Sequence, residues 1–375
     1  MILKFPKNFC WGTATSAYQV EGGIRNDWSV VGEKYDAGIA CDHYNRFEED
    51  FDLAKSMNNN AHRFSIEWAR IEPEEGKFDQ KEIEHYRKVI LALKQRNLEP
   101  FVTLYHWTLP VWFVEKGHWL NKESSEYFAR FVEKVVSEYK DLVKFWVTLN
   151  EPNIYTSYSF LRGIWPPFEK SFYKMQEVVK NLIAAHKESY RVLHKISSDC
   201  QVGIANNNNC FQGILSFFSK YFWNHQFFDA IKDFQEFVGV NYYIPVSLWR
   251  NIVKLGRELT DMSWQVYPKG LYRVLKDLKQ YNKPIYITEN GLADAKDEKR
   301  TKFIIDHLKW VHKAIEEGVD VRGYFHWSLI DNFEWDKGFE PRFGLIEIDY
   351  KNLKRIPRPS SKLYTEICKN NVINV

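Results

Sequence analysis

The feature that most constrains the fold is a regular alternation of short apolar runs with longer amphipathic stretches. The short runs are rich in β-branched and aromatic residues, which indicates strands, and the longer stretches repeat apolar residues at helical spacing. Strands are predicted at residues 9–16, 60–66, 98–105, 145–150, 202–205, 237–243, 284–289 and 321–327. This alternation favours parallel strands that are joined by helices.

The helical stretches complete the pattern. Helices are predicted at residues 46–57, 81–95, 123–139, 172–195, 211–234, 270–280, 299–316 and 361–369. Eight strand–helix units favour a closed (β/α)8 barrel of the TIM type over an open doubly wound sheet. No glycine-rich nucleotide-binding loop follows any strand, which weakens the nucleotide-binding alternative. Since no repeat or linker divides the sequence, residues 1–375 are expected to form a single domain.

Charge and cysteine content argue against several classes of protein. The chain has 52 Lys and Arg against 49 Asp and Glu, interleaved throughout, so neither nucleic acid nor an anionic membrane surface is an expected partner. Its five cysteines are scattered and lack CxxC spacing, which predicts free thiols and no zinc site. The first residues lack the pattern of a secretion signal, and no apolar run is long enough to span a membrane. A cytoplasmic location is therefore predicted.

Two of the predicted strands end on a glutamate. Glu289 follows an apolar run that Pro284 opens and Gly291 closes, and Glu151 directly precedes Pro152, which disfavours helical geometry at that glutamate. One such glutamate by itself is more often a solvated loop residue or a helix cap. In a closed parallel barrel, however, both strand ends lie on the same face, and paired carboxyl groups there are what glycoside hydrolysis requires.

The other predicted strand ends carry polar and aromatic side chains. Amides, an imidazole and carboxylates can hold several hydroxyl groups at once, and indoles provide flat apolar surfaces, so the set suits a neutral sugar better than a phosphate. The candidates are Gln19, Arg63, His106, Trp107, Asn150, Asn241, Tyr243, Trp327, Glu334 and Trp335. The polar run at residues 206–209 is predicted to be a loop.

The motifs occur in the order typical of one family. They are residues 9–22 (FCWGTATSAYQVEG), 63–66 (RFSI), 105–107 (YHW), 148–152 (TLNEP), 241–243 (NYY), 287–291 (ITENG), 327–335 (WSLIDNFEW) and 342–344 (RFG). Along nearly its whole length the chain resembles the family 1 glycoside hydrolases, the β-glucosidase and β-galactosidase family. A single short motif would be weak, but the ordered set is specific.

The resemblance implies a retaining double displacement in which Glu289 is the nucleophile and Glu151 the general acid/base. It also implies that Arg63, Asn241 and Tyr243 support the nucleophile. In retaining enzymes the two carboxyl groups are about 5–5.5 Å apart, too close for an attacking water, so one of them must bond to the sugar. Arg63 and Tyr243 should favour ionised Glu289, and the charge of Glu289 should keep Glu151 protonated.

The resemblance also implies a sugar-binding set: Gln19, His106, Trp107, Asn150, Trp327, Glu334, Trp335 and Phe343. Within it, Asn150 should bind the sugar 2-hydroxyl. Relatives that act on 6-phosphosugars usually have a small hydroxyl residue where Glu334 stands, and a carboxylate would repel the phosphate. Unphosphorylated β-glucosides, β-galactosides or β-fucosides, including short oligosaccharides, are therefore the expected substrates.

Two alternatives stay open, a 6-phospho-β-glycosidase and a non-catalytic carbohydrate-binding barrel. The resemblance implies neither a metal nor a cofactor. Family members are usually longer, and the shortening is expected mainly between the fifth and sixth strands and around Tyr243, where it would affect the leaving-group entrance. Exposure of the aromatic residues of 211–234 leads to the hypothesis of a homo-oligomer.

Overall fold

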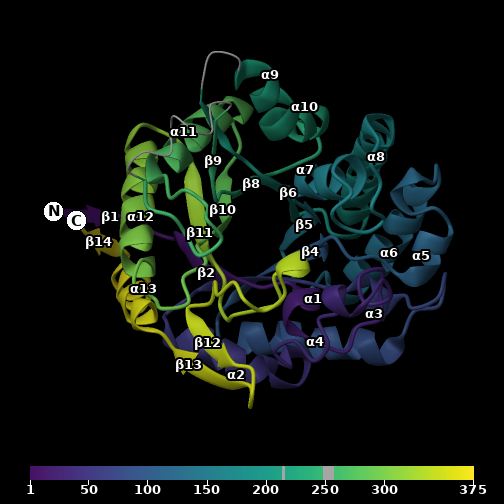
Figure 1. Ribbon diagram of the computed structural model, residues 1–375, viewed down its shortest axis with the longest axis horizontal. Helices are drawn as coiled ribbons and strands as arrows, with labels where there is room; N and C mark the ends of the chain where they lie inside the picture. Colours follow the sequence, from purple (N-terminus) through teal and green to yellow (C-terminus); the bar gives the residue numbers. More distant parts are fainter. Residues whose placement is uncertain (213–215, 248–256) are drawn as a thin grey trace.

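The computed structural model describes residues 1–212, 216–247 and 257–375. A closed barrel of parallel strands forms its centre (Figure 1). The barrel strands are β2 (Cys10–Ala14), β3 (Ala61–Ser65), β4 (Glu99–Tyr105), β5 (Phe145–Asn150), β6 (Gln201–Asn207), β8 (Val238–Asn241), β10 (Ile285–Asn290) and β11 (Val321–Trp327), each beside the next, with β11 closing on β2. The predicted (β/α)8 barrel is confirmed, because each of the predicted strands overlaps one of these.

Long helices surround the strands (Figure 1). They are α2 (His43–Ser56), α4 (Gln80–Gln95), α6 (Ser124–Tyr139), α8 (Phe172–Ile196), α11 (Pro268–Leu278), α12 (Arg300–Glu316) and α13 (Pro359–Asn370). Helix α4 illustrates why they form: Asp79 caps its first turn by accepting from the backbone N–H groups of Lys81 and Glu82. Its buried apolar residues, among them Ile83 and Ile90, recur at helical spacing and face the barrel.

The single helix predicted for residues 211–234 is wrong. The chain there forms β7 (Cys210–Gln212), α9 (Ser216–Lys220), the π-helical turn η4 (Tyr221–His225) and α10 (Gln226–Ile231), and residues 213–215 of the predicted helix lie outside the described residues. A π turn takes up an extra residue and changes the face that follows it. Phe217 and Phe218, in α9 before this turn, are 72% and 68% exposed, whereas Asn224 and His225, within the turn, are buried.

The remaining elements lie at the ends of the barrel. Strand β1 (Ile2–Lys4) pairs with β14 (Val372–Asn374) and holds the two termini together (Figure 1), β12 (Ile346–Asp349) pairs with β13 (Lys354–Pro357), and β7 pairs with β9 (Pro245–Ser247). The short helices are α1 (Ala17–Val20), η1 (Glu33–Tyr35), α3 (Trp68–Ile71), α5 (Val111–Glu115), η2 (His118–Leu120), α7 (Pro152–Thr156), η3 (Ser157–Leu161), η5 (Lys279–Tyr281) and η6 (Trp335–Lys337). Gln19, predicted near the end of the first strand, lies in α1. In the described part of the chain, no helix has the length and apolar character needed to cross a membrane.

Aromatic rings fill the inside of the barrel near the strand starts. Phe101 stacks on Phe145 with ring centroids 4.2 Å apart, and Tyr286 and Phe325 meet Phe101 edge-on. Small residues such as Ala61 lie in the same cluster, so large and small side chains interlock. Because this layer fills the barrel, polar side chains can gather only above it, at the carboxyl ends of the strands.

Candidate active site

Glu289 is the penultimate residue of β10 and its carboxylate is almost fully buried. It accepts a hydrogen bond from Arg63 Nη1 at 2.5 Å and one from the Tyr243 hydroxyl at 2.6 Å. The end of β10 also requires Gly291, because a Cβ at that position would lie 1.7 Å from the Trp327 carbonyl oxygen. Gly291, which is predicted to end the strand, therefore also allows β10 to approach β11 closely.

Glu151 directly follows β5 and has a left-handed backbone conformation, with φ 41° and ψ 56°. Pro152 begins α7 immediately after it, which agrees with the expectation that Glu151 would avoid right-handed helical geometry. Trp107 and Trp335 also have positive φ angles, 76° and 54°. Such conformations cost about 1–3 kcal/mol each and persist where the surrounding packing holds them. Here they turn three side chains toward one cavity.

Arg63 binds Glu289 directly and is connected to Glu151 through Asn150 and Asn241. Its Nη2 donates to Asn150 Oδ1 at 2.6 Å, and its Nε donates to Thr103 Oγ1 at 3.0 Å. Asn241 Nδ2 donates to Glu151 Oε1 at 2.9 Å and to Asn150 Oδ1 at 3.2 Å. These contacts join β3, β4, β5 and β8 to the two carboxyl groups. The supporting side chains are thus fixed by the barrel itself.

The surroundings of the two carboxyl groups differ in charge. Burial raises the pKa of both Glu151 and Glu289. In Glu289 the Arg63 cation and the Tyr243 hydroxyl oppose that effect, whereas Glu151 has the charge of Glu289 nearby and direct hydrogen bonds only from amides. The carboxyl that ionises first is therefore Glu289, and the proton stays on Glu151. Burial, more than the neighbouring charge emphasised in the sequence analysis, raises the pKa of Glu151.

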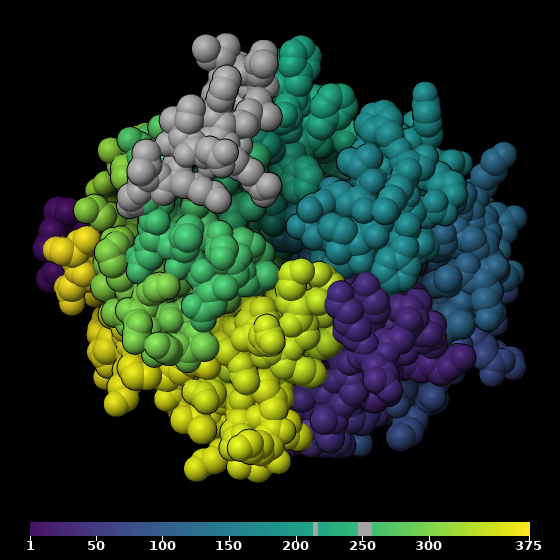
Figure 2. Space-filling view, viewed as in Figure 1, coloured from purple at the N-terminus to yellow at the C-terminus, as the bar shows by residue number. Residues whose placement is uncertain are grey.

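A cavity of about 470 Å³ opens above the carboxyl groups. It lies near the centre of the face seen in Figure 2, where the surface is hollowed between teal, green and yellow segments. Predicted site residues that line it are Gln19, His106, Trp107, Glu151, Tyr243, Glu289, Trp327, Glu334, Trp335 and Phe343. The other predicted residues, Arg63, Asn150 and Asn241, lie beneath the cavity and bind the carboxyl groups or each other.

The wall of the cavity combines neutral polar groups with flat rings. The His106 ring lies nearly parallel to Trp327 and Trp335, at interplanar angles of 17° and 8°. Burial and the Arg63 cation hold the pKa of His106 well below its ordinary range, so the imidazole is neutral. Burial raises the pKa of Glu334 to about 8, with the charges of Glu289 and Glu151 as further causes. Around neutral pH this carboxyl can therefore both donate to and accept from a hydroxyl group.

Several residues that line the cavity are not among those predicted from the sequence. Trp165 packs against Trp107 with ring centroids 4.6 Å apart, and Trp264 lies between Tyr243 and Phe343. No motif distinguishes these tryptophans from core residues. Asn207, also missed, donates to Glu151 Oε1 at 3.0 Å.

The loop predicted at residues 206–209 is only partly correct. Residues 206 and 207 belong to β6, and all four asparagine side chains are buried. The uninterrupted polar run predicts a loop, but the carboxyl ends of barrel strands face a polar site, where a strand can end on polar residues. A polar run directly after a predicted barrel strand was the signal that could have identified Asn207.

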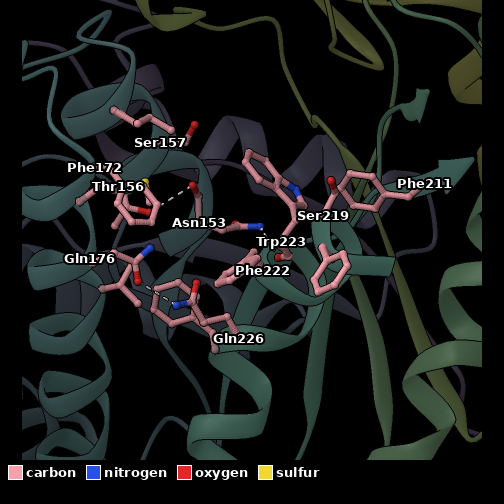
Figure 3. Close-up of a pocket in the computed structure, with 15 residues that line it drawn as sticks. Asn153, Thr156, Ser157, Phe172, Gln176, Phe211, Ser219, Phe222, Trp223 and Gln226 are labelled. Carbon is pink, nitrogen blue, oxygen red and sulfur yellow. Dashed lines mark hydrogen bonds between the residues drawn. The ribbon is translucent and has the colours of Figure 1, made fainter. Parts of the chain in front are cut away.

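A second, more apolar cavity of about 390 Å³ lies beside the first, between α7, α8 and α10 (Figure 3). The two cavities share Ser157, Phe211 and Trp223 as lining residues.

Within residues 1–212, 216–247 and 257–375, no three His, Cys, Asp or Glu side chains are grouped so that they could hold a metal ion. The main cavity is lined by the two carboxyl groups with unlike surroundings, those of Glu151 and Glu289.

Comparison with known proteins agrees with this geometry. The 1,4-β-D-glucan glucohydrolase of Thermotoga neapolitana is 34% identical over 438 aligned positions, which cover 98% of this chain and 99% of that protein. The β-galactosidase of Sulfolobus acidocaldarius is 30% identical, with 99% and 96% covered. Since the first alignment is longer than the 375 residues of this chain, the chain is a shortened relative, as predicted.

Solved structures give the same result. The β-glycosidase from Pyrococcus horikoshii superposes with a TM-score of 0.94 at 40% identity, covering 100% of this chain and 97% of that one. The β-glucosidase from Thermotoga maritima in complex with deoxynojirimycin has a TM-score of 0.91 at 33% identity, covering 99% and 100%. A sequence profile described as Glycosyl hydrolase family 1 matches residues 1–213 and 222–373. With its ordered motifs, its barrel and its paired glutamates, the chain belongs to glycosyl hydrolase family 1.

Proposed function

We propose that the protein is a retaining β-glycosidase that hydrolyses terminal, non-reducing β-D-glucosyl residues and also accepts β-galactosyl and β-fucosyl residues. The observation that carries this proposal is the unequal pair of carboxyl groups. Glu289 has a cation and a phenol as partners, whereas Glu151 has only amides. The relatives named as β-glucosidase, 1,4-β-D-glucan glucohydrolase and β-galactosidase support the choice of sugars.

In the first step, a carboxylate oxygen of Glu289 forms a bond to the anomeric carbon while the glycosidic C–O bond breaks. Glu151 gives its proton to the departing oxygen. Arg63 and Tyr243 keep Glu289 anionic before the attack. Burial raises the pKa of the Tyr243 hydroxyl far above its ordinary value, so it keeps its proton and can donate. Asn150, held by Arg63 and Asn241, is assigned to the sugar 2-hydroxyl.

In the second step, the bond between the sugar and Glu289 breaks as water attacks from the side that the leaving group vacated. The charge of Glu289 disappears when it is esterified, which lowers the pKa of Glu151. Glu151 then accepts a proton from the water, and both glutamates return to their starting states. Two inversions at one carbon leave the β-configuration unchanged.

The test is proton NMR of the first sugar released from an aryl β-glucoside and an aryl β-galactoside. The β-anomer should appear first and convert to the α-anomer only at the rate of free mutarotation. Initial release of the α-anomer would contradict the retaining mechanism. If the folded protein binds glucose but turns over neither glycoside, the non-catalytic carbohydrate-binding barrel would replace the proposal.

The 6-phospho-β-glycosidase alternative makes a different prediction about pH. Below pH 8 the Glu334 carboxyl is largely neutral, and above it the group becomes an anion, because burial raises its pKa to about 8. An anion there should repel a phosphate on the sugar. We expect the preference for aryl β-glucoside over its 6-phosphate to rise by up to about tenfold between pH 7 and 9, as measured by the ratio of kcat/KM values.

The matched control for this prediction is Glu334→Gln, which keeps the size of the side chain and cannot ionise. Its preference should be flat over the same pH range. Faster turnover of the 6-phosphate than of the glucoside by the unmodified protein would favour the phosphoglycosidase alternative instead.

Two further expectations belong to the proposal. A cytoplasmic location is supported by the five cysteines, which are all free thiols and mostly buried. Self-association is supported by the exposed aromatic residues Phe217, Phe218 and Phe222 of α9 and η4. A monomeric mass by light scattering at working concentration would count against self-association.

A further inference from the structure

Four consecutive asparagines, residues 206–209, have no assigned part in the hydrolysis, yet all four side chains are buried. Buried amides destabilise a protein unless hydrogen bonds satisfy them. The hydrogen-bond partners of these asparagines lie in two places, at the catalytic carboxyl group and on η4. One partner is the carboxyl group of Glu151, and the others belong largely to η4, which carries Trp223.

Asn207 contacts both Glu151 and η4 at once. Its Nδ2 donates to Glu151 Oε1 at 3.0 Å, and its Oδ1 accepts from Trp223 Nε1 at 3.3 Å. The orientation of the amide follows from the indole N–H, which only donates, so the Asn207 Oδ1 faces Trp223 and the Nδ2 group faces Glu151. The backbone of Asn207 is held too, because Asn153 Nδ2 donates to its carbonyl at 2.7 Å. The same Nδ2 group donates to the carbonyl of Trp223 at 2.9 Å, and Asn153 and Trp223 are both drawn in Figure 3.

The hydrogen bonds to Glu151 are distributed unevenly over its two oxygens. Oε1 accepts from both Asn207 and Asn241, at 3.0 and 2.9 Å. No described residue forms a hydrogen bond with Oε2. An oxygen that already accepts two N–H groups is a poor position for a proton, so the proton belongs on Oε2. Because Glu151 lines the cavity, Oε2 is the oxygen available to the glycosidic oxygen.

We propose that Asn207 is a positioning residue for the general acid/base: together with Asn241 it holds Glu151 Oε1, so that Oε2 is the oxygen that gives and takes the proton. This inference rests on the proposed function. Trp223 lines the same cavity, and its indole N–H is shared between Asn207 Oδ1 at 3.3 Å and Asn209 Oδ1 at 2.8 Å. Asn207 and Trp223 therefore connect the Glu151 carboxyl group to the wall of the cavity that η4 contributes.

The Asn207 amide also affects the protonation of Glu151. An N–H that donates to Glu151 favours its ionised form and lowers its pKa. Loss of the contact should raise that pKa in the free enzyme and in the glycosyl-enzyme alike. The charged and titratable groups that face Glu151 from other elements stay the same in each variant: Glu289, Arg63, Tyr243, Glu334 and the neutral His106.

The experiment measures pH profiles of kcat/KM for the unmodified protein, Asn207→Ala and Asn207→Asp, with an aryl β-glucoside of poor leaving ability. The basic limb reports loss of the Glu151 proton. It should move to higher pH by about one unit in Asn207→Ala, the scale of one hydrogen bond to a charged group. Asn207→Asp keeps the size of the side chain and adds a like charge, so its limb should move at least as far.

Two controls separate this role from a general loss of structure. Asn208 is equally buried, and its side chain contacts neither Glu151 nor Trp223, so Asn208→Ala should leave the basic limb unchanged. Trp223→Phe keeps a ring and removes the N–H, so its limb should move in the same direction by less. In the Asn207 variants kcat should fall more for a poor leaving group than for a good one, because only the poor one needs the acid.

An unmoved basic limb in folded Asn207→Asp would overturn the inference, as would an equal movement in Asn208→Ala. Equal losses of kcat for good and poor leaving groups in the Asn207 variants would overturn it too. Failure of the proposed function is a separate result, because the unmodified protein would then hydrolyse neither substrate. Restored kcat in Asn207→Gln, whose amide can still reach Oε1, would support positioning by the N–H group.

Discussion

Replacing Glu289 by alanine is expected to reduce kcat/KM for an aryl β-glucoside by about four or more orders of magnitude, the scale seen when an enzyme loses its nucleophile. The variant still has Glu151 to donate a proton, but nothing bonds to the anomeric carbon. Added azide should occupy the space of the missing carboxylate and attack the same face of the sugar. The measured product should then be the α-glycosyl azide.

Glu72→Gln is a control, since Glu72 is also fully buried but does not line the cavity. Its carboxylate accepts hydrogen bonds from Arg130 and Trp68. The Glu72→Gln variant should lose stability and keep kcat. If Glu289→Ala retained most of its activity while folded, or if azide produced a β-glycosyl azide, the assignment of the nucleophile would be wrong. Unfolding of both variants together would mean that the loss came from removing a buried glutamate.

Replacing Glu151 by alanine should produce a loss that depends on the leaving group. For a poor leaving group kcat/KM should fall by about 10²–10⁴, the usual contribution of general acid catalysis, whereas a good leaving group departs without a proton and its first step should be nearly unaffected. The basic limb of the pH profile should disappear with the group that causes it. Azide should now replace water in the second step and yield the β-glycosyl azide.

The two azide products make the assignments of Glu289 and Glu151 independent of each other. The opposite configurations arise because one variant loses the group on the α-face and the other loses the group that activates water on the β-face. A reduction of equal size for good and poor leaving groups in Glu151→Ala would contradict the acid/base role. It would indicate damage to binding or folding instead.

Local sequence determined the barrel strands and the two glutamates. Each strand is a short apolar run bounded by residues that end it, and Pro152 and Gly291 act on the backbone within two residues of Glu151 and Glu289. The polar residues at the strand ends were identified for the same reason, because parallel strands of one barrel end on one face. Motif order then added the assignment of roles.

Where packing determines the direction of a side chain, the predictions from sequence were wrong or only partly correct. The aromatic residues of 211–234 suggested one amphipathic helix, but the π turn η4 turns Trp223 toward the cavity while Phe217 and Phe218 face outward. One extra residue per turn changes which face is buried, and a periodic pattern does not register that change. The asparagine run at residues 206–209 is likewise predicted as a loop, whereas the closed barrel buries all four side chains and includes residues 206 and 207 in β6.

Tertiary structure alone decided the chemistry that distinguishes the two glutamates. Asn207 and Glu151 are 56 positions apart in the chain, and Arg63 and Glu289 are 226 apart, so no local pattern specifies their contacts. Burial is the largest cause of the raised pKa of Glu151, and burial is a property of the closed barrel, not of the residues next to Glu151 in sequence. The sequence by itself determined which carboxyl groups are present and on which face they lie. Only the folded chain, by excluding water and bringing Arg63 and Asn207 to different glutamates, decided which one holds the proton.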